Sequence, residues 1–133
     1  MRIDSHQHFW KFDPVRDSWI DSSMQKIARD FLPQDLKPLL SQSQMEGCVA
    51  VQADQSETET QFLLDLAGKN TFIKGVVGWV DLRADDLSER LDFFSKNPLF
   101  KGVRHILQSV KEGFMMPDSF LRALPHLKYF NLT

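Results

Sequence analysis

Two histidines stand close to the start of the chain, in the string Asp4-Ser5-His6-Gln7-His8. If this string continues an extended strand, His6 and His8 point to the same side, because side chains two positions apart share a face. Two neutral imidazoles that converge on one point favour a divalent metal ion. The alternative is an exposed polar turn that holds two histidines by chance. We favour a metal or reactive-centre role, because Asp4 and a short β-rich run come directly before the pair.

Further candidate side chains occur where later apolar runs end. Gln52 closes the run that begins at Cys48, and Trp79 lies at the end of the run centred on residues 76–80. In parallel α/β folds the carboxyl ends of the strands carry the binding site, so both residues are candidate contacts for a small molecule. The alternatives are that Gln52 simply enters a loop and that Trp79 packs rather than stacks on a substrate.

An arginine and a histidine interrupt the last apolar run, which covers residues 101–107. Arg104 must be paired or face a polar cavity there, because an unpaired buried charge is very costly. Its guanidinium fork suits a carboxylate or the oxygens of a substrate. Neighbouring strand residues face opposite sides, so we expect Arg104 rather than His105 in the cavity, unless the strand ends at this point.

These residues need strands and helices to position them, and both patterns alternate along the chain. The expected strands cover residues 1–5, 48–53, 72–82 and 101–107. A long polar stretch from Phe9 to about Asp30 predicts a loop with at most a short helix. Helical patterns follow from Pro33 to about Gln44, from a capping box at Ser56 to Gly68, from Leu87 to Phe94, and from Phe120 to Leu127, where Pro125 should kink or shorten the helix.

The alternation predicts an α/β fold. Strands that are apolar on both faces and alternate with amphipathic helices favour a parallel sheet, and their spacing suits the units of a (β/α)8 barrel. About four βα units are present, and Asn131-Leu132-Thr133 resembles the start of a fifth strand. We therefore expect residues 1–133 to form a single partial barrel domain, the N-terminal half, truncated at the start of strand 5. A small doubly wound domain with a different strand order is the alternative.

Composition excludes several classes of partner. The formal net charge is -2 and the isoelectric point is about 6.0, which leaves no basic footprint for nucleic acid or an anionic membrane. The single cysteine, Cys48, excludes an internal disulfide and a multi-cysteine zinc site, and its apolar neighbours indicate a core position. There is no apolar stretch of about 20 residues and no signal peptide, so we expect a cytoplasmic protein.

Four motifs together resemble a known family. Residues 3–10, 51–54, 75–82 and 101–108 (IDSHQHFW, VQAD, GVVGWVDL and KGVRHILQ) resemble, in the same order, the amidohydrolase-related (amidohydrolase 2) proteins of the sugar-lactonase type. L-fuconolactonases and L-rhamnonolactonases are the most similar members. The resemblance extends over essentially the whole chain, and four motifs in order are far more specific than any one of them.

The resemblance implies a (β/α)8 barrel that hydrolyses a sugar lactone, such as L-fuconolactone, to the aldonic acid. His6 and His8 would bind a divalent metal, zinc in the first instance, which activates water for attack on the lactone carbonyl. Arg104 would hold substrate oxygens, with Gln52, Trp79 and His105 as further substrate contacts. Other members of the superfamily catalyse decarboxylation, which these motifs also allow.

The family pattern continues beyond the residues present here. Such barrels place functional histidines after strands 5 and 6, and an aspartate after strand 8 that acts as the general base, all beyond Thr133. A catalytic metal site needs about three protein ligands plus water, and two are offered. We therefore expect the chain to be inactive alone and to self-associate through exposed sheet edges. The alternative is a non-catalytic half-barrel that self-associates or binds a partner half.

Overall fold

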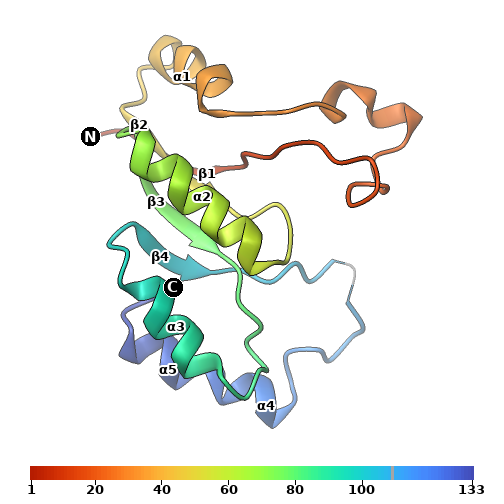
Figure 1. The fold of residues 1–133 in the computed structure, drawn as a ribbon, viewed down its shortest axis with the longest axis vertical. Helices are drawn as coiled ribbons and strands as arrows, with labels where there is room; N and C mark the ends of the chain where they lie inside the picture. The colour runs from red at the N-terminus through yellow and green to blue at the C-terminus, as the bar shows by residue number, and fades with distance from the viewer. Residues whose placement is uncertain (109) are drawn as a thin grey trace.

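A parallel sheet of four strands forms the centre of the molecule (Figure 1). The computed structural model describes residues 1–108 and 110–133. Every neighbouring pair of strands is parallel, and the spatial order β1-β2-β3-β4 is also the order along the chain. The strands are β1 (Ile3–Gln7), β2 (Gly47–Val51), β3 (Ile73–Gly78) and β4 (Phe100–Val103).

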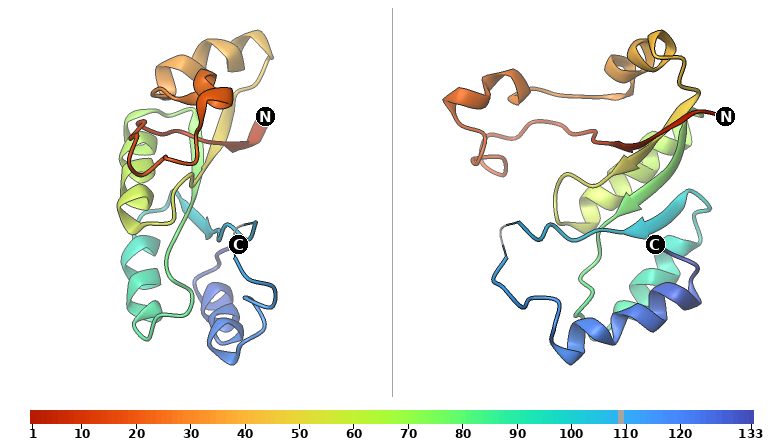
Figure 2. Two further views of the ribbon diagram at one scale, coloured as in Figure 1. Left: turned by 90° about the vertical axis from the view of Figure 1, so that its right-hand side faces the viewer. Right: turned by 180° about the vertical axis from the view of Figure 1, so that it is seen from behind.

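Helices connect these strands. They are α1 (Pro33–Gln42), α2 (Glu57–Lys69), α3 (Leu87–Ser95), α4 (Asp118–Leu121) and α5 (Ala123–Tyr129), with a 3-10 helix, η1, at Ser22–Ile27. The side views place α2 and α3 on the same side of the sheet (Figure 2). A strand order that never reverses has no switch point, whereas a doubly wound sheet requires one. The doubly wound alternative is therefore wrong, and the predicted N-terminal half of a (β/α)8 barrel is confirmed.

Local sequence explains where the longer helices begin. Ser56 precedes α2, and its hydroxyl accepts the backbone N–H of Glu59 at 3.2 Å, which is one half of the predicted capping box. The Glu59 carboxylate accepts the Ala53 N–H rather than that of Ser56. Pro33 opens α1, where its fixed φ is favourable and its missing N–H costs nothing. The final helical pattern divides into α4 and α5, and Pro125 lies in the first turn of α5, where proline is tolerated.

The end of the chain runs beside β4. The Thr133 N–H donates to the Lys101 carbonyl at 3.1 Å, and the Val103 N–H donates to the Thr133 carbonyl at 2.8 Å. Gly102 permits this approach, since a Cβ atom there would lie 2.5 Å from the Thr133 oxygen. These two bonds place the last residue beside β4, and the start of a fifth strand here stays a prediction.

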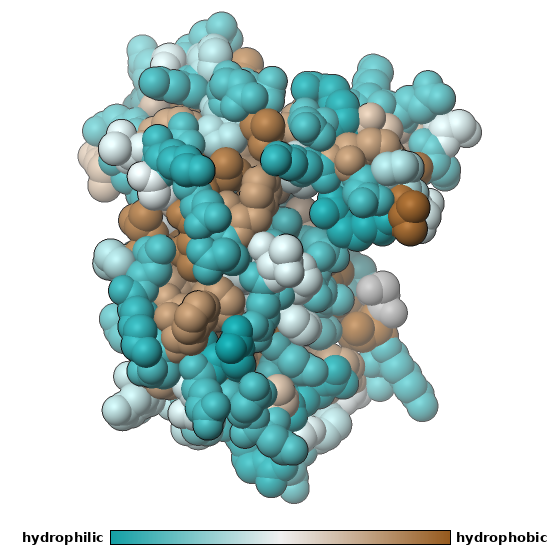
Figure 3. Space-filling view, viewed as in Figure 1, coloured by the Kyte–Doolittle hydropathy of each residue, from teal (hydrophilic) through white to brown (hydrophobic). Residues whose placement is uncertain are grey.

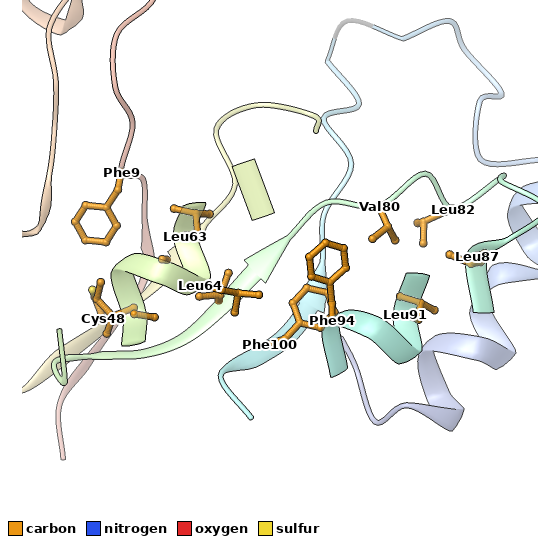
Figure 4. Close-up of a cluster of buried hydrophobic side chains, with 14 of the residues drawn as sticks. Phe9, Cys48, Leu63, Leu64, Val80, Leu82, Leu87, Leu91, Phe94 and Phe100 are labelled. Atoms are coloured by element: carbon orange, nitrogen blue, oxygen red, sulfur yellow. The ribbon is translucent and has the colours of Figure 1, made fainter. Parts of the chain in front are cut away.

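The core lies between the sheet and the helices on its outer side. Leu63 of α2 and Leu91 of α3 are completely buried, and Figure 4 shows Phe94 and Phe100 side by side. Their ring centroids are 5.5 Å apart, within the favourable range for aromatic pairs. Cys48 is also fully buried, and burial raises the pKa of its thiol to about 11, which fits the predicted core position rather than a reactive thiol.

The strands are shorter than the apolar runs that predict them. β3 ends at Gly78 rather than at Leu82, and β4 ends at Val103 rather than at Leu107. Beyond these points the backbone bonds to side chains, as when the Ile106 N–H donates to the Gln55 side chain at 3.0 Å. After β3, Val80 and Leu82 are buried by packing and not by the sheet, whereas after β4 Leu107 is 42% exposed.

The outer surface shows hydrophilic residues with apolar patches over α2 and α3 (Figure 3). A groove of about 490 Å³ between these helices is lined by Phe62, Phe93 and Arg90, among others. None of the residues that line it is a candidate for chemistry. None of the helices in the described part of the chain is long and apolar enough to cross a membrane.

Candidate functional site

The two N-terminal histidines face each other at the carboxyl end of β1. The Nε2 atoms of His6 and His8 are 3.2 Å apart, and their ring centroids are separated by 4.9 Å. Asp4 helps to shape this turn, because its carboxylate accepts the His6 N–H at 3.1 Å. Both imidazoles therefore present the same ring nitrogen to one point in space.

A contact with β2 fixes the state of the second histidine. His8 Nδ1 lies 2.9 Å from the carbonyl oxygen of Val51, which can only accept a hydrogen bond. Nδ1 therefore carries the proton, and the lone pair of a neutral His8 is on Nε2, the atom that faces His6. Burial lowers the pKa of His8, the charges of His6 and Arg104 lower it further, and the Val51 contact opposes the shift.

The geometry of this pair fits two ligands of one metal ion. Zn–N bonds of about 2.05 Å in tetrahedral coordination place two nitrogens about 3.3 Å apart, and the Nε2 atoms here are 3.2 Å apart. The hydrogen bond from Nδ1 to a carbonyl is the outer contact that metal-bound histidines usually make. Among the described residues, no group of three or more His, Cys, Asp and Glu side chains is arranged around a common metal position. His6 and His8 are thus the two candidate ligands in the described part of the chain.

Gln52 and Arg104 lie beside this pair and contact each other. The Gln52 side-chain amide donates to the Arg104 carbonyl at 3.1 Å, and Arg104 Nη1 donates to the Gln52 carbonyl at 3.2 Å. Gln52 is fully buried, and its Oε1 has no hydrogen-bond partner among the described residues. No ion pair involves Arg104 in residues 1–108 and 110–133, so most of its N–H donors are available to a ligand.

Trp79 and His105 form a second pair on the adjacent strand ends. The Trp79 indole N–H donates to His105 Nδ1 at 3.3 Å, so a neutral His105 carries its own proton on Nε2. His105 also stacks on Phe114, with ring centroids 4.5 Å apart. Burial lowers the pKa of His105, the positive charge of Arg83 lowers it further, and Asp81 opposes both.

The structure thus brings the six predicted site residues to one edge of the sheet, in two groups. His6, His8, Gln52 and Arg104 form one group, and Trp79 and His105 form the other. Arg104 and His105 both lie beyond the end of β4, because the strand stops at Val103. The exception that the sequence analysis allowed, a strand that ends at this point, therefore applies, and His105 stays a candidate beside Arg104.

Sequence reasoning missed two residues that hold this edge together. Gln55 accepts the Ile106 N–H, and the hydroxyl of Thr60 contacts both backbone polar groups of Trp79. Thr60 had a signal: it is a polar residue on the face of α2 that also carries Leu63 and Leu64, and all three are buried. Gln55 had none, because a glutamine in a polar loop is unremarkable from sequence.

Comparison with known proteins agrees with this arrangement. The amidohydrolase family model matches residues 3–121. The L-fucono-1,5-lactonase of Burkholderia ambifaria is 38% identical over 120 residues, which is 90% of this chain and 41% of that protein. The L-fucono-1,5-lactonase of Burkholderia multivorans is 45% identical over 130 residues, which is 96% of this chain and 44% of that protein.

Solved structures show the same relationship. A crystal structure of an amidohydrolase from Burkholderia multivorans with bound zinc superposes with a TM-score of 0.94 at 39% identity, covering 99% of this chain and 47% of that one. A probable 2-pyrone-4,6-dicarboxylic acid hydrolase from Acinetobacter baumannii shares the fold at 16% identity, with a TM-score of 0.76 and the same coverage. The chain spans less than half the length of these relatives. It belongs to the amidohydrolase family.

Proposed function

We propose that the chain supplies the N-terminal part of the active site of a hydrolase that opens a sugar-derived lactone, resembling L-fucono-1,5-lactone, to its aldonic acid. The observation that carries this proposal is the convergence of His6 and His8 Nε2, 3.2 Å apart, at the sheet edge where Arg104 also lies. Two relatives named as L-fucono-1,5-lactonases support the substrate class. We regard residues 1–133 as one partial barrel domain.

Each candidate residue has a role in this proposal. His6 and His8 hold a divalent cation, zinc in the first instance, as the zinc bound in a similar structure suggests. A bound cation of this kind activates water and polarises a carbonyl oxygen. The His8 Nδ1–H donates to the Val51 carbonyl and keeps the ring oriented. Arg104 directs its free N–H donors to the lactone oxygens and to the carboxylate of the product.

The second group orients the sugar. Trp79 offers an apolar ring for the faces of the sugar, and His105 offers Nε2–H as a donor to one of its oxygens. Gln52 donates to the Arg104 carbonyl, and its buried Oε1, which has no hydrogen-bond partner among the described residues, is an acceptor available to the substrate. The general base lies beyond residue 133 in this proposal. We also propose a cytoplasmic location, where the buried Cys48 stays reduced.

The proposal is tested first by metal binding to the 133-residue chain. Isothermal titration with zinc should give one site per chain. In His6→Ala and in His8→Ala the zinc affinity should fall at least ~10–100-fold, because loss of a residue that only contacts a metal ligand already costs that much. His126→Ala is the matched control, because His126 lies in α5, outside the site, and should bind zinc as the unaltered chain does. Equal affinities in all four proteins would contradict the metal assignment.

Turnover is the second test. Because the proposal gives residues 1–133 two metal ligands and places the general base beyond them, the chain alone should not hydrolyse L-fucono-1,5-lactone above the spontaneous rate. A chimera that adds the remaining residues of the Burkholderia multivorans relative should hydrolyse it, and His8→Ala in the chimera should abolish this activity. Hydrolysis by the chimera that survives His8→Ala would rule out the proposed role of the histidine pair.

A further inference from the structure

One hydroxyl group holds both backbone polar groups of Trp79. Thr60 Oγ1 accepts the Trp79 N–H at 2.7 Å and donates to the Trp79 carbonyl at 2.8 Å. Thr60 belongs to α2 and is completely buried, so these bonds are shielded from water. The N–H belongs to the peptide before Trp79 and the carbonyl to the peptide after it, so one hydroxyl holds the backbone on both sides of this residue.

The end of β3 explains why this arrangement is needed. The last backbone bond between the ends of β3 and β4 runs from the Arg104 N–H to the Gly78 carbonyl. Among the described residues, the N–H and C=O of Trp79 have no partner on a neighbouring strand. Gly78 makes room for Thr60, because a Cβ atom there would lie 2.5 Å from the Thr60 methyl carbon and 2.7 Å from its hydroxyl oxygen. The position of Thr60 on α2 therefore requires a glycine at residue 78 of β3.

The indole of Trp79 contacts His105. Its N–H donates to His105 Nδ1 at 3.3 Å, and that bond decides which nitrogen of His105 carries the proton. The two Thr60 bonds fix the backbone from which the indole projects, so the hydroxyl is placed to hold the indole at His105 Nδ1. His105 can then donate from Nε2, the nitrogen that the indole leaves free.

We propose that Thr60 is a positioning residue, which orients Trp79 and through it fixes His105 as an Nε2–H donor to an oxygen of the substrate. This inference rests on the proposed function for the role of His105, but the positioning itself is a property of the chain without substrate. The competing interpretation is that Thr60 only satisfies the end of a strand. In that case its loss would lower stability and leave the indole and the imidazole unchanged.

The test is nuclear magnetic resonance on the 133-residue chain with ¹⁵N-labelled tryptophan and histidine. In the unaltered chain the His105 ring should show an unprotonated Nδ1 and a protonated Nε2. Thr60→Val keeps the shape and removes the hydroxyl, so the indole N–H of Trp79 should exchange with solvent at least about tenfold faster, and His105 should populate both tautomers. Thr60→Ser keeps the hydroxyl and should restore the original spectrum.

Two controls complete the design. Thr58→Val changes an exposed threonine on the same helix and should leave the indole exchange rate and the His105 tautomer as they are. Trp79→Phe removes the indole N–H that donates to His105, so His105 should populate both tautomers even though Thr60 is unchanged. A folded Thr60→Val chain with an unchanged indole rate and tautomer would overturn the proposal.

A measurement on the unaltered chain covers the case in which Thr60→Val does not fold. If the Thr60 hydroxyl holds Trp79, the backbone amide and the indole N–H of Trp79 should become exposed in the same local opening. The two groups should then show similar protection from hydrogen exchange. An indole N–H that exchanges at the free rate beside a protected amide would overturn the proposal as well. These readouts need neither metal nor lactone, so a failure of the proposed function would appear separately, in the zinc titration and the hydrolysis assay.

Discussion

Gln52 and Arg104 hold each other by two hydrogen bonds, each from the side chain of one residue to the backbone carbonyl of the other. The residues are 52 positions apart and belong to the ends of β2 and β4, with β3 between them in the sheet. The two bonds therefore connect the loops that follow two strands that are not neighbours. They set the position of the guanidinium relative to His8, whose pKa the Arg104 charge helps to lower.

A double-mutant cycle should detect this connection. Gln52→Leu and Arg104→Leu should each destabilise the chain by about 0.5–1.5 kcal/mol, the usual net value of a hydrogen bond. Because both bonds brace the same two loops, the double variant should depart from additivity by about 0.5 kcal/mol or more. Urea unfolding of the four proteins measures this coupling. Strictly additive losses would show that the two bonds act independently.

The lowered pKa of His8 should appear as a pH dependence of stability in the metal-free chain. In the unfolded state His8 has the ordinary histidine pKa of 6.5, whereas its pKa in the folded state is lower, so folded His8 takes up a proton only at lower pH. Stability from this group is therefore present above pH 6.5 and is lost as the pH falls from there to the folded pKa. His8→Gln should flatten this part of the curve, measured by urea unfolding in the presence of a chelator, and His126→Gln should not.

Glu59 should produce the opposite dependence. Its carboxylate is only 6% exposed and accepts the Ala53 N–H at 3.1 Å, and burial raises its pKa above the ordinary value of 4.5. The stability contribution of the protonated form is thus present below pH 4.5 and is lost as the pH rises through the folded pKa. Glu59→Gln does not titrate, so its stability relative to the unaltered chain should improve between pH 4 and pH 7.

Urea unfolding of Glu59→Gln and of the unaltered chain at several pH values in this range checks the prediction. The quantity to compare is the difference between their free energies of unfolding at each pH. Glu112→Gln changes an exposed carboxylate and serves as the matched control. A difference between Glu59→Gln and the parent that stays constant with pH would show that Glu59 titrates normally.

The core between α2 and the sheet should respond strongly to truncation. Leu63 is completely buried, and Leu63→Ala should lower the free energy of unfolding by about 2–5 kcal/mol, because it removes apolar contacts and leaves a cavity. Leu39 of α1 is 55% exposed, so Leu39→Ala should change stability by no more than about 0.5 kcal/mol. Denaturant unfolding of both variants provides the comparison. Similar losses would mean that α2 is not packed on the sheet as described.

Local patterns predicted the features that depend on neighbouring residues. The alternation of apolar runs and amphipathic stretches determined the parallel sheet and the type of each element. The spacing of His6 and His8 predicted that their rings share a face, although His8 lies one residue beyond β1 and its ring is held by the Val51 carbonyl. The Ser56 cap and the division of the last helix near Pro125 were predictable for the same reason.

Only the tertiary structure decided where strands end and which distant residues meet. β4 stops at Val103, the Arg104 N–H makes one last backbone bond to Gly78, and the Ile106 N–H bonds instead to the Gln55 side chain. Arg104 and His105 therefore both lie beyond the strand, at the same edge. The contact between Thr60 and Trp79 joins a helix to the end of a strand 19 positions away. No periodicity encodes such contacts, because they depend on how the helix lies on the sheet. The sequence therefore determined the elements and the histidine pair, and packing decided the rest of the site.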